Sequence, residues 1–287
     1  MASLKETKNR ISSVQNTLKI TSAMKMVASA KFHQSQVAAK KVHNYEQSML
    51  ILLNNLMEGR DELDFVFATE RPVKRVALVP ISSDSGLCGS FNSNVLKMAE
   101  EQIEAYQKEG IELVLYPVGE KITHSLRQSY PVLEDGRHLV NKPTIEKCKA
   151  FTGLLMKGFQ AGSYDKVVFL YHHLKTATRQ VLSDEVMLPY TPAEKQLSTV
   201  KPQERITEPS AAYFLKSLFP QVLCTRIYNA ISESLVAEFA ARMTAMQIAT
   251  DNGNDLLRDL TILYNKTRQQ TITSQIQDLA GGRIRRE

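Results

Sequence analysis

The sequence predicts an α/β protein in which the N- and C-terminal helices form a long antiparallel two-helix coiled coil and the middle of the chain forms an α/β domain. Apolar residues recur at helical spacing near both ends, and short apolar runs alternate with helical stretches between them. We expect residues 1–60 to be the N-terminal coiled-coil helix, residues 72–192 the globular α/β domain, and residues 207–287 the C-terminal coiled-coil helix.

The first long helix is predicted by an uninterrupted apolar stripe. Residues 3–57 contain neither Pro nor Gly, and their apolar or small residues are spaced by threes, fours and sevens, which places them on one helix face. The stripe consists of Leu4, Ile11, Val14, Leu18, Thr21, Ala28, Phe32, Ala39, Val42, Met49, Leu53 and Leu56. Because it is longer than a globular surface helix requires, it favours a coiled coil.

The middle of the chain alternates between strand and helix patterns. Strands are expected at residues 76–81, 111–118, 166–173 and 179–188. Helices are expected at residues 95–109, at 120–128, and from an N-cap at Thr144 to Gln160. This alternation with short connections predicts a Rossmann-like α/β layer with largely parallel strands.

A second long helix is predicted after the Pro-rich residues 189–209. The helical period returns at Ser210, and Pro220 is expected to kink or restart the helix. The stripe beyond it consists of Ile227, Ile231, Leu235, Phe239, Met243, Met246, Leu256, Leu260, Leu263, Thr267 and Thr271. Residues 251–254 are locally typical of a turn, whereas the heptad phase favours a continuous helix there. Both long helices would project beyond a domain of this size, so each is the available partner for the other, and they run antiparallel because both join the same domain.

The net charge of +6 is concentrated at the two ends of the chain. Residues 1–41 hold eight Lys or Arg and one Glu, and residues 258–287 hold six basic and three acidic groups. Lys5, Lys8 and Arg10 lie in the first turns of a helix, where the helix dipole favours acidic side chains. This placement predicts an acidic protein surface as the partner, with a solvated basic face as the alternative.

Composition and hydropathy exclude several classes of protein. No apolar run approaches the roughly 18 residues needed to span a membrane, and the three cysteines are widely spaced, against a disulfide framework or a zinc motif. The basic start has some features of a presequence, but its apolar pattern runs unbroken into the first helix, so we expect no leader to be cleaved.

Motifs for catalysis or cofactor binding are missing from the sequence. It contains neither a Walker A loop nor G-x-G-x-x-G, H-E-x-x-H or C-x-x-C. The loop from Asp84 to Phe91 follows a strand and precedes a helix, but a tight turn explains it better than a phosphate site. His172 and His173 would point to opposite faces of a strand, unlike a chelating pair. We therefore expect no catalytic residue, cofactor or metal, and interpret the chain as an interaction protein.

Three ordered segments resemble the gamma subunit of F-type ATP synthases. The first is residues 11–30, with Ala23-Met24-Lys25-Met26-Val27-Ala28 at its centre. The second is residues 81–92, and the third is residues 241–253 followed by Tyr264-Asn265-Lys266 and Arg268-Gln269. Length and order agree over nearly the whole chain, and the compact central domain suggests a bacterial member. The resemblance also implies that the C-terminal helix continues through residues 251–254, with Gly253 at a close helix approach.

This resemblance implies a non-catalytic rotating central stalk of a proton-translocating ATP synthase. One copy per complex would couple proton flow through the ring of c subunits to ATP synthesis or hydrolysis in the alpha/beta hexamer, and would regulate ATPase activity. The implied partners are the alpha, beta and epsilon subunits and the c ring, not nucleic acid. MgATP and MgADP would bind the alpha and beta subunits. The chain would be peripheral to the cytoplasmic face of a bacterial inner membrane.

The resemblance further implies residues at subunit interfaces. Met24, Lys25 and Met26 would face the beta subunits, although coiled-coil packing is an equal interpretation for the two methionines. Arg268, Gln269 and Thr273 would meet a loop low in beta. For Arg268, a charge exposed to solvent is the alternative. Glu208 would contact the c ring.

The chain departs from the family pattern at several positions. Gln275 and Arg283 stand where the C-terminal signature of the family has Glu and Ala, which puts in doubt any role that needs a charge at position 275. Ser85 and Ser90 stand where a basic residue and Gly are common.

Two other classes of protein remain as alternatives. A DNA-binding coiled coil would use the basic helices against phosphates, but the basic residues lie within the heptads rather than in a separate segment before them. An α/β enzyme would use Cys88 as its nucleophile, but the sequence indicates no base beside it.

Overall fold

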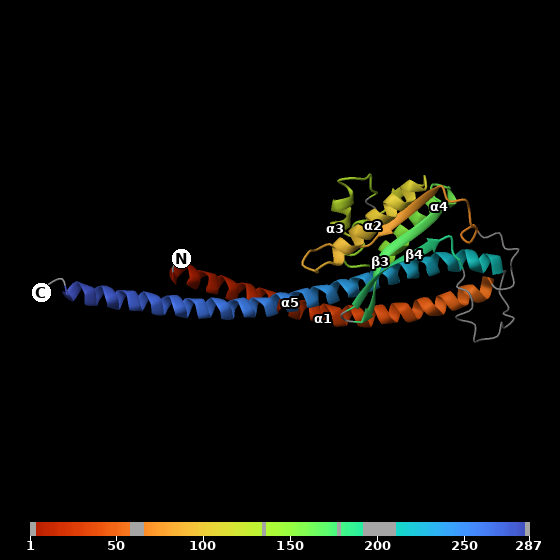
Figure 1. Cartoon of the computed structure of the whole chain (residues 1–287). Helices are drawn as coiled ribbons and strands as arrows, with labels where there is room; N and C mark the ends of the chain where they lie inside the picture. Colours follow the sequence, from red (N-terminus) through yellow and green to blue (C-terminus); the bar gives the residue numbers. More distant parts are fainter. Residues whose placement is uncertain (1–3, 58–65, 134–135, 177–178, 192–210, 285–287) are drawn as a thin grey trace. The chain divides into compact units, whose positions relative to one another are not determined.

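The two long helices and the sheet are present in the computed structural model (Figure 1). The residues that it describes are 4–57, 66–133, 136–176, 179–191 and 211–284. The chain divides into two compact units: the two ends, up to Ser29 and from Arg242 onward, form one, and residues 30–241 form the other. Each unit therefore contains a part of both long helices.

The long helices are continuous. α1 is Leu4–Met57 and α5 is Ala211–Ile284. The expected restart at Pro220 is wrong, because α5 runs through this residue; Phe219 and Val222 on either side are buried, and this packing offsets the hydrogen bond that proline cannot donate. The local turn at residues 251–254 is also wrong, whereas the heptad phase correctly indicated a helix.

In the unit formed by the chain ends, α1 and α5 pair in opposite directions. The Thr250 hydroxyl donates a hydrogen bond to Thr21 Oγ1 at 3.0 Å. Further along α5, a Cβ added to Gly253 would lie 2.6 Å from Leu18 Cδ2. A later residue of α5 thus faces an earlier residue of α1, which makes the pair antiparallel. The missing side chain of Gly253 allows the close approach that was expected there.

The α/β unit contains a four-stranded sheet in the order β2-β1-β3-β4. The strands are β1 (Arg75–Pro80), β2 (Glu112–Leu115), β3 (Lys166–Thr176) and β4 (Arg179–Leu188). β1 pairs parallel with both β2 and β3, and β4 returns antiparallel to β3. The strands are largely parallel, as the sequence predicts.

Alternate residues of the central strands face two separate cores. Val76, Leu78 and Val168 point to one face, which α2 (Phe91–Lys108) and α3 (Glu120–Leu126) cover. Ala77 and Phe169 point to the other face, against α4 (Ile145–Gln160) and parts of α1 and α5. The sheet is thus buried on both faces, as its continuous apolar runs indicate.

A capping residue predicted from the sequence marks the start of α4. The Thr144 side chain accepts a hydrogen bond from the backbone N–H of Lys147, which confirms its role as the N-cap of α4.

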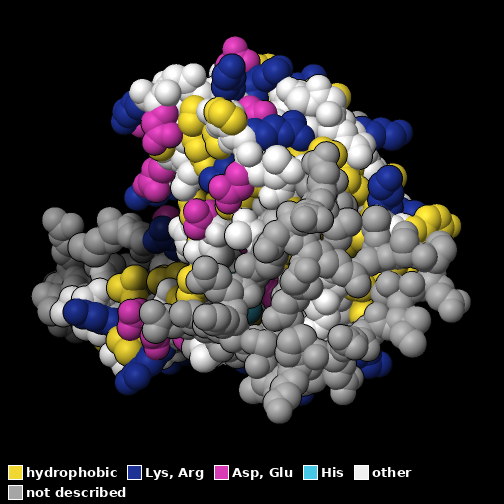
Figure 2. Space-filling model, turned by 90° about the vertical axis from the view of Figure 1, so that its right-hand side faces the viewer, with side chains coloured by type: hydrophobic (Ala, Val, Ile, Leu, Met, Phe, Trp, Pro, Cys, Tyr) yellow, Lys and Arg dark blue, Asp and Glu magenta, His cyan; other side chains and the backbone are white. Residues whose placement is uncertain are grey.

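Figure 2 shows Lys and Arg side chains intermixed with Asp and Glu on one face of the molecule. None of the helices among the described residues has the length and apolar character needed to cross a membrane.

Candidate partner-binding surface

The helix pair formed by the chain ends leaves many large apolar side chains in solvent. They are Ile20, Met26, Val27, Ile248, Leu256, Ile262, Leu263, Ile272 and Ile276. Two paired helices can bury only the faces that they turn toward each other, so the remaining apolar faces stay exposed. An exposed apolar surface of this extent, interspersed with basic residues, marks a protein-binding site. We call these nine residues the apolar band.

The first group of candidate residues lies on α1. Met24 and Lys25 are partly buried, and Met26 is 64% exposed. Packing between helices therefore remains the simpler interpretation for Met24, whereas Met26 belongs to the apolar band. Their roles toward a partner stay predictions.

The second group lies on α5, well separated from the first. Arg268, Gln269 and Thr273 are exposed, and the Thr273 hydroxyl donates a hydrogen bond to the Gln269 carbonyl oxygen at 2.9 Å. Arg268 lies about 27 Å further along α5 than Thr250, the residue that pairs with Thr21 near the first group. The two groups therefore lie at different levels of the helix pair. Glu208 lies outside the described residues.

Most of the apolar band was missed from the sequence. Ile20, Ile248 and Ile262 do not belong to the predicted stripes, which contain only residues that repeat in the heptad phase. An isoleucine outside that phase on a coiled-coil helix was the available signal. Leu256 and Leu263 were assigned to the α5 stripe, but they are 49% and 44% exposed.

The loop between β1 and α2 is a tight turn with a buried thiol. Leu87 and Gly89 adopt positive φ values of 63° and 59°. Cys88 is only 2% exposed, packs with Phe91 and Ala237, and has Asn92 Nδ2 at 3.2 Å from its sulfur. A substrate has no access to a thiol in this position, which argues against the enzyme that uses Cys88.

The two adjacent histidines of β3 have different environments, as the strand geometry predicts. His172 is buried and its ring stacks on Phe91 at 4.2 Å between centroids. Burial lowers the pKa of His172 to about 4, so the ring is neutral. His173 is exposed, and its Nδ1 lies 2.6 Å from Glu233 Oε2. They are a core and a surface residue rather than a chelating pair.

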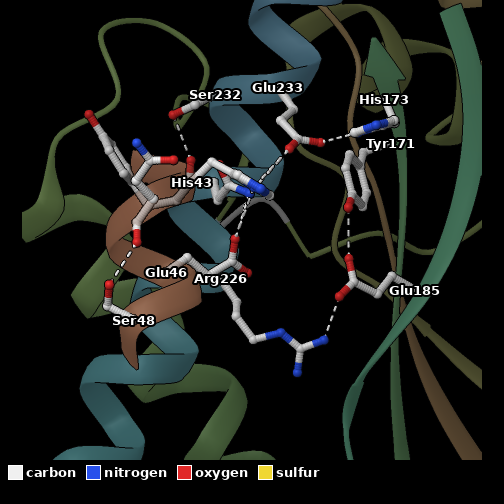
Figure 3. Close-up of polar contacts among 12 residues, drawn as sticks. His43, Glu46, Ser48, Tyr171, His173, Glu185, Arg226, Ser232 and Glu233 are labelled. Atoms are coloured by element: carbon white, nitrogen blue, oxygen red, sulfur yellow. Dashed lines mark hydrogen bonds and ion pairs between the residues drawn. The ribbon is translucent and has the colours of Figure 1, made fainter. Parts of the chain in front are cut away.

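Charged side chains from four elements meet where α1 and α5 cross the hairpin of β3 and β4 (Figure 3). Arg226 of α5 pairs with Glu185 of β4, which also accepts a hydrogen bond from the Tyr171 hydroxyl at 2.7 Å. On the other side, Asn229 Nδ2 donates to Glu46 Oε2 at 2.7 Å. His43, His173 and Glu233 complete this group, which we call the charge network. It ties the long helices to the sheet within the α/β unit.

Glu46 makes the stability of the α/β unit depend on pH. Burial, opposed by Arg226 and reinforced by Glu185 and Glu233, raises the pKa of Glu46 from 4.5 to about 7. The native state therefore keeps a proton that the unfolded chain releases above pH 4.5. The free energy of unfolding should fall as the pH rises from 5 to 8, by up to about 3 kcal/mol from this group.

Urea unfolding of the Glu46→Gln variant measures this contribution. Tyrosine emission reports on the α/β unit, because the chain has no Trp and only Tyr264 of its ten tyrosines lies outside residues 30–241. Between pH 5 and pH 8, the free energy of unfolding of the unmodified protein should fall more than that of Glu46→Gln. The variant Glu70→Gln, at an exposed carboxyl, is the control and should follow the unmodified protein. Parallel curves for Glu46→Gln and the unmodified protein would contradict the expectation.

Comparison with known proteins shows similarity over almost the full chain. A family model described as ATP synthase matches residues 3–283. The ATP synthase gamma chain of Phocaeicola vulgatus is 42% identical over 98% of this chain and 99% of its own length. That of Bacteroides fragilis is 44% identical with the same coverage.

Solved structures show the same fold. A chain from the central stalk and c-ring of the Tetrahymena thermophila mitochondrial ATP synthase is 25% identical, with a TM-score of 0.59 over 80% of this chain and 99% of its own length. A chain of the Euglena gracilis mitochondrial ATP synthase is 18% identical, with a TM-score of 0.66 over 97% and 92% of the two chains.

Proposed function

The chain belongs to the family of ATP synthase gamma chains. We propose that, as the central stalk, it couples proton flow through a membrane ring of c subunits to ATP synthesis or hydrolysis in an alpha/beta hexamer. The gamma chain is not a catalytic subunit. The observation that supports this coupling role is the apolar band together with the basic residues on the same helix pair. MgATP and MgADP bind the alpha and beta subunits, and this chain acts on them mechanically.

The asymmetry of the helix pair supports a rotary role. α5 continues beyond the start of α1, and the exposed apolar residues are distributed unequally over the two helices. A pair with different faces presents a different surface to each of three catalytic sites as it turns. Their affinities for nucleotide then alternate with the angle of rotation.

We assign the contacts as follows. Met24, Lys25 and Met26 face an acidic segment of the beta subunits, and the α5 group with Arg268 meets a loop low in beta. Glu208 contacts the c ring, and epsilon binds beside the α/β unit. One copy is present in each complex, peripheral to the cytoplasmic face of the bacterial inner membrane.

Reconstitution tests the proposal. We expect one copy of the chain to join a hexamer of the alpha and beta subunits from the same organism, measured by native mass, and MgATP hydrolysis to rise sharply on its addition. A chain that stays apart from the hexamer and leaves hydrolysis unchanged would refute the proposal. Salt-dependent binding of DNA at physiological ionic strength would then favour the nucleic-acid alternative.

Reversing the charge at Lys25 should weaken this assembly. In the variant Lys25→Glu, a like charge faces the acidic segment of beta, and the dissociation constant should rise roughly tenfold, with a smaller effect at high salt. The variant Lys97→Glu, on the exposed face of α2, is the matched control and should assemble normally. Equal affinities for the two variants would remove Lys25 from the interface.

A further inference from the structure

A hollow in the α/β unit has no part in the proposed rotary contacts. It lies between α1, α4 and α5 and has a volume of about 740 Å³. All of its lining residues belong to residues 30–241, whereas the apolar band belongs to the other unit. A volume of this size lies within the range of roughly 300–1,000 Å³ that is usual for small-molecule sites.

The walls of the hollow are mainly apolar. Two tyrosines, Tyr45 from α1 and Tyr228 from α5, contribute aromatic rings, and Ile145 and Met156 contribute aliphatic surface from α4. Ile145 is 62% exposed and Tyr45 is 56% exposed, so the hollow opens to solvent beside them. Covering large exposed apolar side chains such as these with an apolar chain removes much apolar surface from water, which favours binding.

Gly153 leaves room for an occupant in the wall formed by α4. A Cβ added to Gly153 would meet no atom within 4 Å. A glycine inside a helix costs about 1 kcal/mol relative to alanine, and here close packing does not demand it. A larger side chain substituted for Gly153 would therefore fill part of the hollow without displacing its neighbours.

The charges around the hollow have one sign. Lys41 and Lys149 line it, and none of the described lining residues is acidic. Neither lysine forms an ion pair with a carboxylate among the described residues. Burial raises the pKa of the Cys224 thiol in the wall, and the Thr152 hydroxyl and the Lys149 ammonium, which also line the hollow, oppose this effect.

We propose that this hollow binds an anionic amphiphile with a single apolar chain, a long-chain fatty-acid carboxylate. The apolar tail lies along the tyrosines and Met156, and the carboxylate lies between Lys41 and Lys149. A nucleotide fits poorly, because its phosphates carry several negative charges and only two cations, Lys41 and Lys149, line the hollow, whereas a carboxylate carries a single charge. The site is independent of the proposed rotary function.

Fluorescence of cis-parinarate, a polyene fatty acid, tests the proposal on the full chain. The dissociation constant should be on the order of 10 µM. Since the chain has no Trp, the variant Tyr45→Trp supplies a single energy-transfer donor at the mouth of the hollow. The variant Tyr106→Trp, on α2 at the opposite face of the sheet, is the matched control. Transfer should be efficient from the first donor and weak from the second.

Two sets of variants separate the tail from the carboxylate. Gly153→Leu fills the hollow and should weaken binding at least tenfold, while Gly153→Ala should retain it. Lys41→Gln with Lys149→Gln should weaken the binding of cis-parinarate roughly fivefold but leave that of its methyl ester unchanged. Lys157→Gln, on the same helix but outside the hollow, should have no effect.

Three outcomes would overturn the proposal. Equal binding by Gly153→Leu and the unmodified chain would place the probe elsewhere. Equal affinity for acid and ester, unaffected by the lysine variants, would exclude an anionic ligand. Binding by the isolated chain that is lost in the assembled ATP synthase would show that a neighbouring subunit fills the hollow. None of these outcomes affects the reconstitution of MgATP hydrolysis.

Discussion

Gly158→Ala should lower the free energy of unfolding of the α/β unit by about 3 kcal/mol, although alanine is the better helix former. A Cβ at this position of α4 would lie 2.3 Å from the Tyr164 hydroxyl oxygen and 2.5 Å from its Cζ. Tyr164 is fully buried and donates a hydrogen bond to the Leu155 carbonyl oxygen at 2.8 Å. Its rigid ring must move, which combines overpacking with the loss of a buried hydrogen bond.

Gly153→Ala is the matched control for this variant, because it makes the same change in the same helix. The added methyl group enters open space, so only the gain in helix propensity remains. The free energy of unfolding should rise by roughly 0.5–1 kcal/mol. Urea unfolding followed by tyrosine emission measures both variants. Effects of equal sign would mean that Tyr164 does not restrict the space at Gly158.

These opposite effects indicate which parts of the fold local sequence can predict. The strands, the cap at Thr144 and the stripe of α1 follow from periodicity and composition, and they are present in the structure. Gly153 and Gly158 are both glycines within the same predicted helix, so local sequence does not distinguish them. Only the packing of Tyr164, which follows α4 in the chain, distinguishes them.

The continuity of α5 illustrates the same limit. Pro220 and residues 251–254 each favour an interruption by their local propensity. Tertiary packing overrides this propensity, with buried neighbours around Pro220 and with Leu18 of α1 against Gly253. At residues 251–254 the heptad phase, which reports packing over a longer range, correctly indicated a continuous helix.

The candidate surface was predicted only in part, for a different reason. Its basic charge is visible in the sequence because eight Lys or Arg accumulate in residues 1–41. Most of its apolar band was not predicted, because the sequence alone does not show which of the apolar residues outside the heptad phase face a partner. The charge network was missed as well, since Glu46, Glu185 and Arg226 lie far apart in sequence and only the crossing of the long helices with the hairpin brings them together.

Arg226→Met should destabilise the α/β unit by about 3 kcal/mol at pH 8. Arg226 is 12% exposed, pairs with Glu185, and lies over the Tyr190 ring at 5.6 Å. Its charge also lowers the pKa of Glu46, against the stronger raising effect of burial. Removing it leaves Glu46, Glu185 and Glu233 without the cation that compensates them, and a buried charge without its partner is costly.

Two further variants show whether this loss comes from the charge. Lys216→Met, at an exposed position of α5, also replaces a cation with methionine but lies outside the network, and it should alter stability by less than about 0.5 kcal/mol. The double variant Arg226→Met with Glu46→Gln should recover part of the loss at pH 8, when the carboxyl of Glu46 would otherwise ionise. It should recover little at pH 5, where the native state already holds that proton. Equal recovery at both values would mean that Arg226 stabilises the unit through its packing on Tyr190 rather than through its charge.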